Sequence, residues 1–168
     1  GATSFNVAVS ATNGTPQPVA VTFTNTSGND YLLTGDGIGG AGALTKSGNG
    51  EATLATNNTH TGGTTVNDGV LRLGNNTTTG SVPGTITINA PGTLEFFRSN
   101  GGNIGNFTGD GALWIVGNGL SGQPSYDITT TTAGLTGPAT NHEARTRKDP
   151  ADFDNTAPTI KKPHCGQD

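Results

Sequence analysis

The acidic residues are the first place to look for chemistry, because two carboxylates on one face of a β structure can cleave a glycosidic bond. Before residue 139 the chain has seven of them: Asp30, Asp36, Glu51, Asp68, Glu95, Asp110 and Asp127. Four of the aspartates adjoin glycine or asparagine, the usual setting of aspartate in a turn. We therefore predict no catalytic residue and no enzymatic activity, since a cleaving site needs a carboxylate pair within ~10 Å on one face.

Histidine and cysteine offer no second site of this kind. The Asp-Gly turns could chelate calcium, but the spacing Gly-Gly-x-Gly-x-Asp of calcium-binding repeats is not reproduced. We expect His60 on the surface of a turn without metal partners, since His142 and His164 lie near the C-terminus. Cys165 is the single cysteine and cannot form an intrachain disulfide. We predict no metal site and no cofactor.

Trp114 is the residue best suited to contact a ligand. If Leu113 and Ile115 point into a core, strand alternation places the single tryptophan on the outside. Exposed aromatic residues often mark surfaces that contact sugars or proteins. The alternatives are that a loop such as 117–125 covers Trp114, or that Trp114 itself lies in the core.

The composition limits which elements can carry such residues. Gly, Thr and Asn make up 75 of 168 residues, aromatic residues only 5%, and methionine is absent, which makes a helical protein improbable. No apolar run approaches the roughly 18 residues of a membrane span. The net charge of −4 argues against nucleic-acid binding, because no basic patch is present to displace counterions.

Short β-strands separated by turns fit this composition better than disorder does. β-Branched and aliphatic residues alternate with polar ones in runs such as 19–24, 69–73 and 84–88. Between the runs lie Asn-Gly, Asp-Gly and Pro-Gly pairs, which tolerate turn conformations. The pattern predicts ordered β structure up to about residue 138.

A repeated motif, Gly-x-Leu, indicates how the strands are arranged. It occurs at 42–46, 69–73, 92–96 and 111–115, with starts 27, 23 and 19 residues apart. Repeats of this length that contain strands are typical of a solenoid. We predict an all-β fold, a parallel β-helix with two or three short strands per coil. A β-sandwich is the runner-up, because regularly spaced strands and turns fit it too.

The motif also predicts the columns of a narrow core. Its leucines would form one internal stack of Leu44, Leu71, Leu94 and Leu113. The next inward column would be Lys46, Leu73, Phe96 and Ile115, in which the lysine breaks the pattern and suggests a strand end or a coil edge. Arg72 and Glu95 would face outward on adjacent coils as an ion pair.

A known family resembles part of this pattern. Residues 41–54 read Ala-Gly-Ala-Leu-Thr-Lys-Ser-Gly-Asn-Gly-Glu-Ala-Thr-Leu, and residues 62–75 begin with Gly-Gly-Thr-Thr-Val and continue with Asn-Asp-Gly-Val-Leu-Arg-Leu. The whole stretch, 41–75, resembles the autotransporter-associated β-strand repeat, with a looser likeness from about 19 to 117. It departs from the family pattern at His60, where a tyrosine is usual, and at Glu51-Ala52, where Thr-Leu is expected.

The resemblance implies a right-handed β-helical passenger region exported to the surface of a bacterium, where family members include adhesins. The translocating barrel of such proteins is not found in this chain, so we expect a processed or excised piece. The last thirty residues differ from the repeats, because they hold half of the charges together with three prolines. We predict two parts: a solenoid over 1–138 and a charged arm or linker over 139–168.

The functional prediction is a noncatalytic extracellular segment for surface display, adhesion or scaffolding through the lateral faces of the solenoid. Its partners would be glycans or cell-surface proteins, with no nucleic acid and no membrane insertion. One alternative is a subunit that assembles with itself into filaments, by end-to-end stacking of coils or by strand addition. The second alternative is a polysaccharide-binding or polysaccharide-cleaving β-helix.

Overall fold

The computed structural model describes residues 3–100, 102–103, 105–117, 126–127 and 134–143. Within these ranges the chain forms strands and turns, with no helix. The strands are β1 (Thr3–Val9), β2 (Ala20–Phe23), β3 (Asn29–Gly35), β4 (Ala43–Lys46), β5 (Glu51–Leu54), β6 (Thr64–Val66), β7 (Val70–Thr77), β8 (Thr85–Ile88), β9 (Thr93–Arg98), β10 (Gly102–Asn103), β11 (Asn106–Gly109), β12 (Ala112–Gly117), β13 (Tyr126–Asp127), β14 (Gly134–Leu135) and β15 (Ala139–Glu143).

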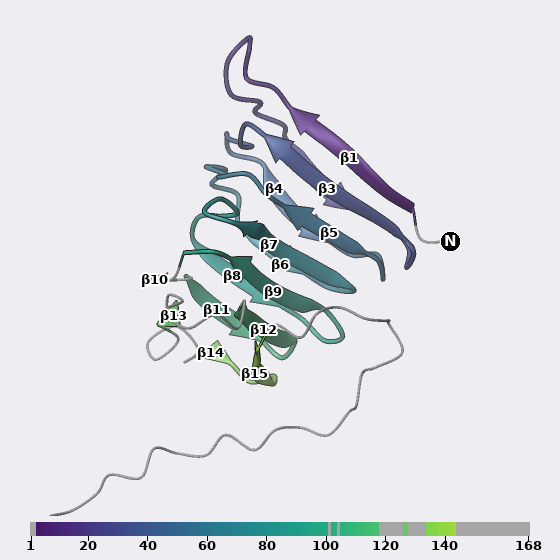
Figure 1. Cartoon of the computed structure of the whole chain (residues 1–168), viewed down its shortest axis with the longest axis vertical. Helices are drawn as coiled ribbons and strands as arrows, with labels where there is room; N and C mark the ends of the chain where they lie inside the picture. Colours follow the sequence, from purple (N-terminus) through teal and green to yellow (C-terminus); the bar gives the residue numbers. More distant parts are fainter. Residues whose placement is uncertain (1–2, 101, 104, 118–125, 128–133, 144–168) are drawn as a thin grey trace, which may run out of the picture.

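Two parallel sheets face each other along the length of the molecule (Figure 1). The first has seven strands in the order β1-β3-β5-β7-β9-β12-β15, and the second has six in the order β14-β11-β8-β6-β4-β2. The chain alternates between the sheets, so each coil contributes one strand to each. β10 and β13 form a separate parallel pair. This arrangement is a β-solenoid, as predicted, and it excludes the β-sandwich.

The core is the narrow space between the two sheets. Its buried apolar residues are Phe23, Leu33, Ile38, Leu44, Ala52, Leu54, Val66, Leu71, Leu73, Ile86, Ile88, Leu94, Phe96, Phe107, Leu113 and Ile115. Side chains meet across the gap, as Phe96 of the first sheet and Phe107 of the second do with ring centroids 5.8 Å apart. Because only alternate residues of each strand face inward, a chain with few apolar residues can still fill this core.

The predicted leucine stack is correct for three of its four members. Leu71, Leu94 and Leu113 pair in register on β7, β9 and β12. Leu44 is buried but lies in the other sheet, between Val21 and Thr64. The physical reason is that Gly-x-Leu marks the entry from a turn into a strand, and strands of both sheets begin this way.

The same correction applies to the next column. Leu73, Phe96 and Ile115 are in register in the first sheet. Lys46 belongs to the second sheet, paired with Phe23 and Val66, and it is the last residue of β4. The strand-end prediction is therefore confirmed, but the lysine side chain lies in the core, with none of its surface exposed.

The C-terminal part of the ladder runs past the change in composition at residue 138. β15 (Ala139–Glu143) pairs in parallel with β12 and continues the first sheet. The remaining residues of the predicted arm, 144–168, lie outside the described residues, as do His164 and Cys165. The arm stays a prediction.

Candidate functional site

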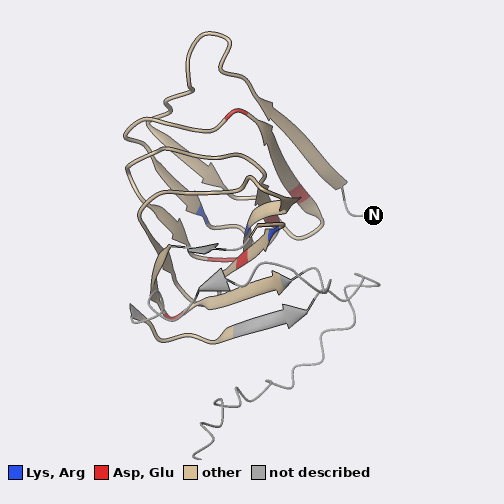
Figure 2. Cartoon of the chain, turned by 60° about the vertical axis from the view of Figure 1, so that its left-hand side comes forward, with Lys and Arg blue, Asp and Glu red and all other residues tan. Residues whose placement is uncertain are grey.

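A cluster of charged side chains lies on the outer face of the first sheet. Arg72 of β7 lies between acidic residues of the two neighbouring strands: its Nε is 2.6 Å from Oε1 of Glu95 on β9, and its Nη1 is 2.5 Å from Oε1 of Glu51 on β5. Figure 2 shows acidic and basic residues close together in this part of the solenoid. Thr53 Oγ1 also donates a hydrogen bond to Glu51 Oε1 at 3.0 Å.

The predicted Arg72–Glu95 pair is confirmed, but Glu51 was missed. The signal that could have found it is the register of β5 on β7, which places Thr53 beside Arg72 and Glu51 beside Val70. A long arginine side chain reaches this diagonal position on the same face of the sheet.

The cluster is more than an exposed ion pair. The side chains of Arg72, Glu51 and Glu95 are only 13%, 12% and 8% exposed. Burial by itself would lower the pKa of Arg72, but the hydrogen bond and charge of Glu95, with the charges of Glu51 and Asp30, raise it above its usual value. The guanidinium carbon also lies 5.8 Å from the ring centroid of Phe97, within range of a cation–π interaction.

We expect Arg72→Gln to lower the free energy of unfolding by ~2 kcal/mol, because it removes the positive charge that lies between two partly buried carboxylates. Urea denaturation followed by circular dichroism measures the loss. The triple variant that also carries Glu51→Gln and Glu95→Gln is the control, and it should recover most of the stability. A single variant as stable as the wild type would show that the cluster contributes nothing.

The same geometry bears on the polysaccharide-cleaving alternative. Glu51 and Glu95 both contact one guanidinium and so form a carboxylate pair on one face. A glycosidase needs one carboxyl that is protonated and free to reach the substrate. Here both side chains are largely buried and ion-paired, so this arrangement serves stability better than acid catalysis.

Trp114 lies next to this cluster. It is in register with Glu95, and its neighbours Leu113 and Ile115 are buried while Trp114 is partly exposed. The outward orientation is therefore confirmed, and the alternative that Trp114 belongs to the core is wrong. The loop proposed to cover it falls largely outside the described residues. Contact with a ligand stays a prediction.

The predicted surface position of His60 is wrong. It was expected on the surface, but it is only 1% exposed. Its Nε2 is 3.0 Å from Thr64 Oγ1, and its Nδ1 has no hydrogen-bond partner among the described residues. The ring is therefore packed as a buried core residue. Burial lowers the pKa of His60 below its usual value of 6.5, which favours the neutral ring.

We expect the protein to lose stability as the pH falls below about 6.5. The unfolded chain then binds a proton on His60 that the folded chain resists binding, so protons favour unfolding. The measurement is urea denaturation at pH 7.5 and pH 5. In His60→Tyr this part of the pH dependence should disappear, and a slope unchanged by that substitution would assign it to other groups.

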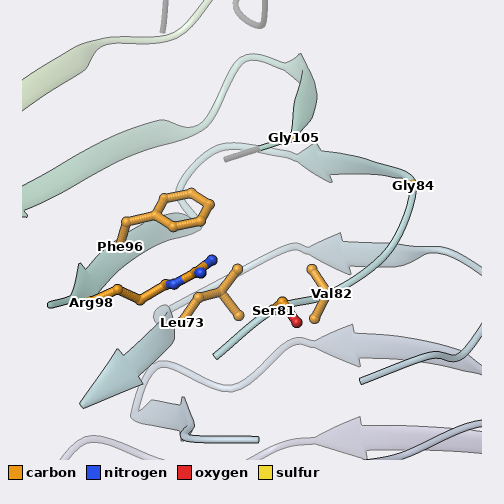
Figure 3. A pocket seen from close by; sticks show the side chains of 7 residues that line it. All are labelled: Leu73, Ser81, Val82, Gly84, Phe96, Arg98 and Gly105. Carbon is orange, nitrogen blue, oxygen red and sulfur yellow. The ribbon is translucent and has the colours of Figure 1, made fainter. Parts of the chain in front are cut away.

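A small pocket opens at one side of the solenoid (Figure 3). Leu73, Phe96 and Arg98 line it from the first sheet, and the segment with Ser81 and Val82 closes the other side. Arg98 Nε donates a hydrogen bond to Asn100 Oδ1 at 3.1 Å. The volume of about 200 Å³ is below the roughly 300 Å³ at which ligand pockets begin. It is therefore too small for a drug-sized ligand.

Metal ligands do not gather anywhere in the described part of the chain, where no group of three or more His, Cys, Asp or Glu side chains is found. Within the same residues no helix is long and apolar enough to cross a membrane.

Comparison with known proteins identifies one repeat. Residues 44–73, which run from the second residue of β4 to the fourth residue of β7, match the family model of the passenger-associated transport repeat. No curated protein and no solved structure matches the chain. The match falls within the predicted span 41–75 and confirms that resemblance. The chain therefore carries an autotransporter passenger repeat within a β-solenoid.

Proposed function

We propose that the chain is a noncatalytic segment of an extracellular bacterial passenger, and that its solenoid serves as a scaffold with adhesive lateral faces. The matched repeat at 44–73 supports this proposal, because that repeat is a structural element of autotransporter passengers. Such a repeat implies a secreted or surface protein.

The observation that carries the proposal is the continuity of the coils on either side of the repeat. Ala52 and Leu71 lie inside the matched residues, and Leu94 and Leu113 continue the same column beyond them. Each added coil lengthens such a stack by about 4.8 Å, so repetition produces an extended rod. A rod with a narrow filled core suits display and spacing better than catalysis in a deep cleft.

Surface exposure is tested on cells that produce the protein. Antibodies raised against the chain should label intact cells, and protease added outside should remove the label while a periplasmic marker survives. Labelling that appears only after the cells are permeabilised would contradict the proposal.

Trp114 is the proposed adhesive contact on the lateral face, with glycans or cell-surface proteins as its partners. Its outward orientation and partial exposure support this role, because an exposed aromatic ring can stack on a sugar or pack on a protein surface. Beads coated with the chain should adhere to cells or glycan arrays, and Trp114→Ala should weaken the adhesion. The control Val19→Ala removes an apolar side chain that is 94% exposed elsewhere. Equal binding by both variants would remove Trp114 from the contact.

A second candidate function is self-assembly by strand addition, which β1 favours. Among the described residues this strand pairs only with β3, and it carries no charged residue to discourage further pairing. Phe5 and Val7 are 44% and 41% exposed beside a groove of about 650 Å³ at this end of the core. Light scattering of the chain at rising concentration tests the idea: growth in size supports assembly, and a constant monomer mass contradicts it.

A further inference from the structure

The outer face of the second sheet carries a column of threonines, one from each of five successive strands. The pairing of β2, β4, β6, β8 and β11 places them in direct register. They are Thr22, Thr45, Thr65, Thr87 and Thr108. No pairing within this run is shifted, so the column follows the axis of the solenoid.

These side chains point away from the core. The residues before and after Thr65 and Thr87, such as Val66 and Ile86, are buried, whereas the threonines themselves are exposed or partly exposed. Threonine is branched at Cβ, so few rotamers are open to it on a strand. Each coil therefore presents a methyl and a hydroxyl group at an almost fixed position.

The columns on either side keep the threonines accessible. On one side the paired residues are Ala20 with Ala43 and Thr85 with Asn106, all of modest size. On the other side Asn67 and Asn89 follow their strands, and Asn89 Nδ2 donates a hydrogen bond to Asn67 Oδ1 at 2.8 Å. That bond holds two neighbouring coils in the same polar array.

The face carries little charge: Asp110 lies on the side of Asn67 and Asn89, where its Oδ1 accepts a hydrogen bond from Ala90 N at 2.9 Å. The threonine column and the column of Ala20 and Ala43 contain no Lys, Arg, Asp or Glu. The charge cluster described above lies on the opposite sheet, around Arg72. An uncharged face does not attract an anionic polymer or a lipid surface, both of which are bound through basic groups.

We propose that this threonine face binds the surface of ice. Strands repeat every 4.8 Å or so along the column, so the threonine side chains form one regular row on a flat sheet. Prism faces of hexagonal ice present rows of water oxygens with a similar repeat. Ordered methyl and hydroxyl groups at that spacing hold water in the positions of the lattice, which liquid water occupies only transiently.

Other periodic or flat partners fit this face less well. Crystalline polysaccharides are held by stacking on aromatic rings, and none of the five strand positions in the column is aromatic. Stable protein interfaces are anchored by buried Trp, Tyr or Arg side chains, which the column also does not supply. The inference is independent of the passenger function, since ice binding needs only the register of the second sheet.

The test uses the whole chain in solution near its freezing point. We expect a gap between melting and freezing temperatures and inhibition of ice recrystallisation. Thr65→Tyr places a bulky ring at the centre of the column and should abolish both effects. The matched control is Thr34→Tyr, at a partly exposed position next to buried Leu33 in the first sheet. Circular dichroism of both variants checks that they fold.

The outcomes separate the possibilities. Activity that is lost in Thr65→Tyr and kept in Thr34→Tyr supports the proposal. A folded wild-type chain with no effect on ice overturns it, and so does equal loss in both variants. Sedimentation with crystalline cellulose or chitin in the absence of any effect on ice would assign the face to a polysaccharide instead. None of these results bears on whether the protein is displayed on cells.

Discussion

Gly69→Ala is expected to lower the free energy of unfolding by at least ~3 kcal/mol, or to prevent folding. Gly69 lies in the turn before β7 with φ +63°, where a Cβ atom would come within 2.4 Å of the carbonyl oxygens of both Gly48 and Gly50. These are backbone atoms of the preceding coil, so no side chain can move aside. The only relief is to separate the coils, which weakens the strand pairing on both sheets.

Gly84→Ala is the matched control for this prediction. Gly84 also has a positive φ, +75°, but a Cβ atom there meets nothing within 4 Å. The substitution therefore carries only the conformational cost of a left-handed residue, about 1 kcal/mol. Both variants are measured by urea denaturation in the same buffer. Similar losses for the two would show that backbone conformation decides, and that the close approach of the coils does not.

The fold was predictable from the sequence because its signals are local. The glycine and asparagine turns, the alternating strands and the Gly-x-Leu motif each report on local geometry, which a single sequence contains. Stacking coils of similar length then leaves few arrangements other than a solenoid. The motif does not show to which sheet a strand belongs. Leu44 lies in the second sheet and Leu71 in the first although both follow the same motif, and only the pairing of residues between neighbouring coils distinguishes the two sheets.

Polarity alone does not predict that a polar residue such as His60 is buried. His60 and Lys46 are buried because neighbouring coils surround them, and those neighbours are about twenty residues away in the chain. A signal for Lys46 was present, since it stands two residues after inward-facing Leu44. The threonine column also needed the register, because its five members are adjacent only once the coils are stacked.

Lys46 gives the second large effect. Its side chain is fully buried in the core column between Phe23 and Val66. The amino group donates hydrogen bonds to the carbonyl oxygen of Gly48 and, at 3.3 Å, to that of Asp68. Burial lowers the pKa of Lys46, while the charges of Asp68 and Asp30 act in the opposite direction. The cation is therefore stabilised by backbone carbonyl oxygens and by aspartate carboxylates from neighbouring coils.

Lys46→Glu should prevent folding or lower the free energy of unfolding by more than ~4 kcal/mol, because a buried carboxylate would face carbonyl oxygens and Asp68. Lys46→Met keeps the length and removes the charge. This variant should lose no more than ~2 kcal/mol of unfolding free energy. It leaves two carbonyl oxygens without a donor, but it also removes the cost of burying a charged amino group. Circular dichroism and urea denaturation distinguish the two variants. If methionine is as damaging as glutamate, the hydrogen bonds of the amino group matter more than its charge, and the column depends on the lysine itself.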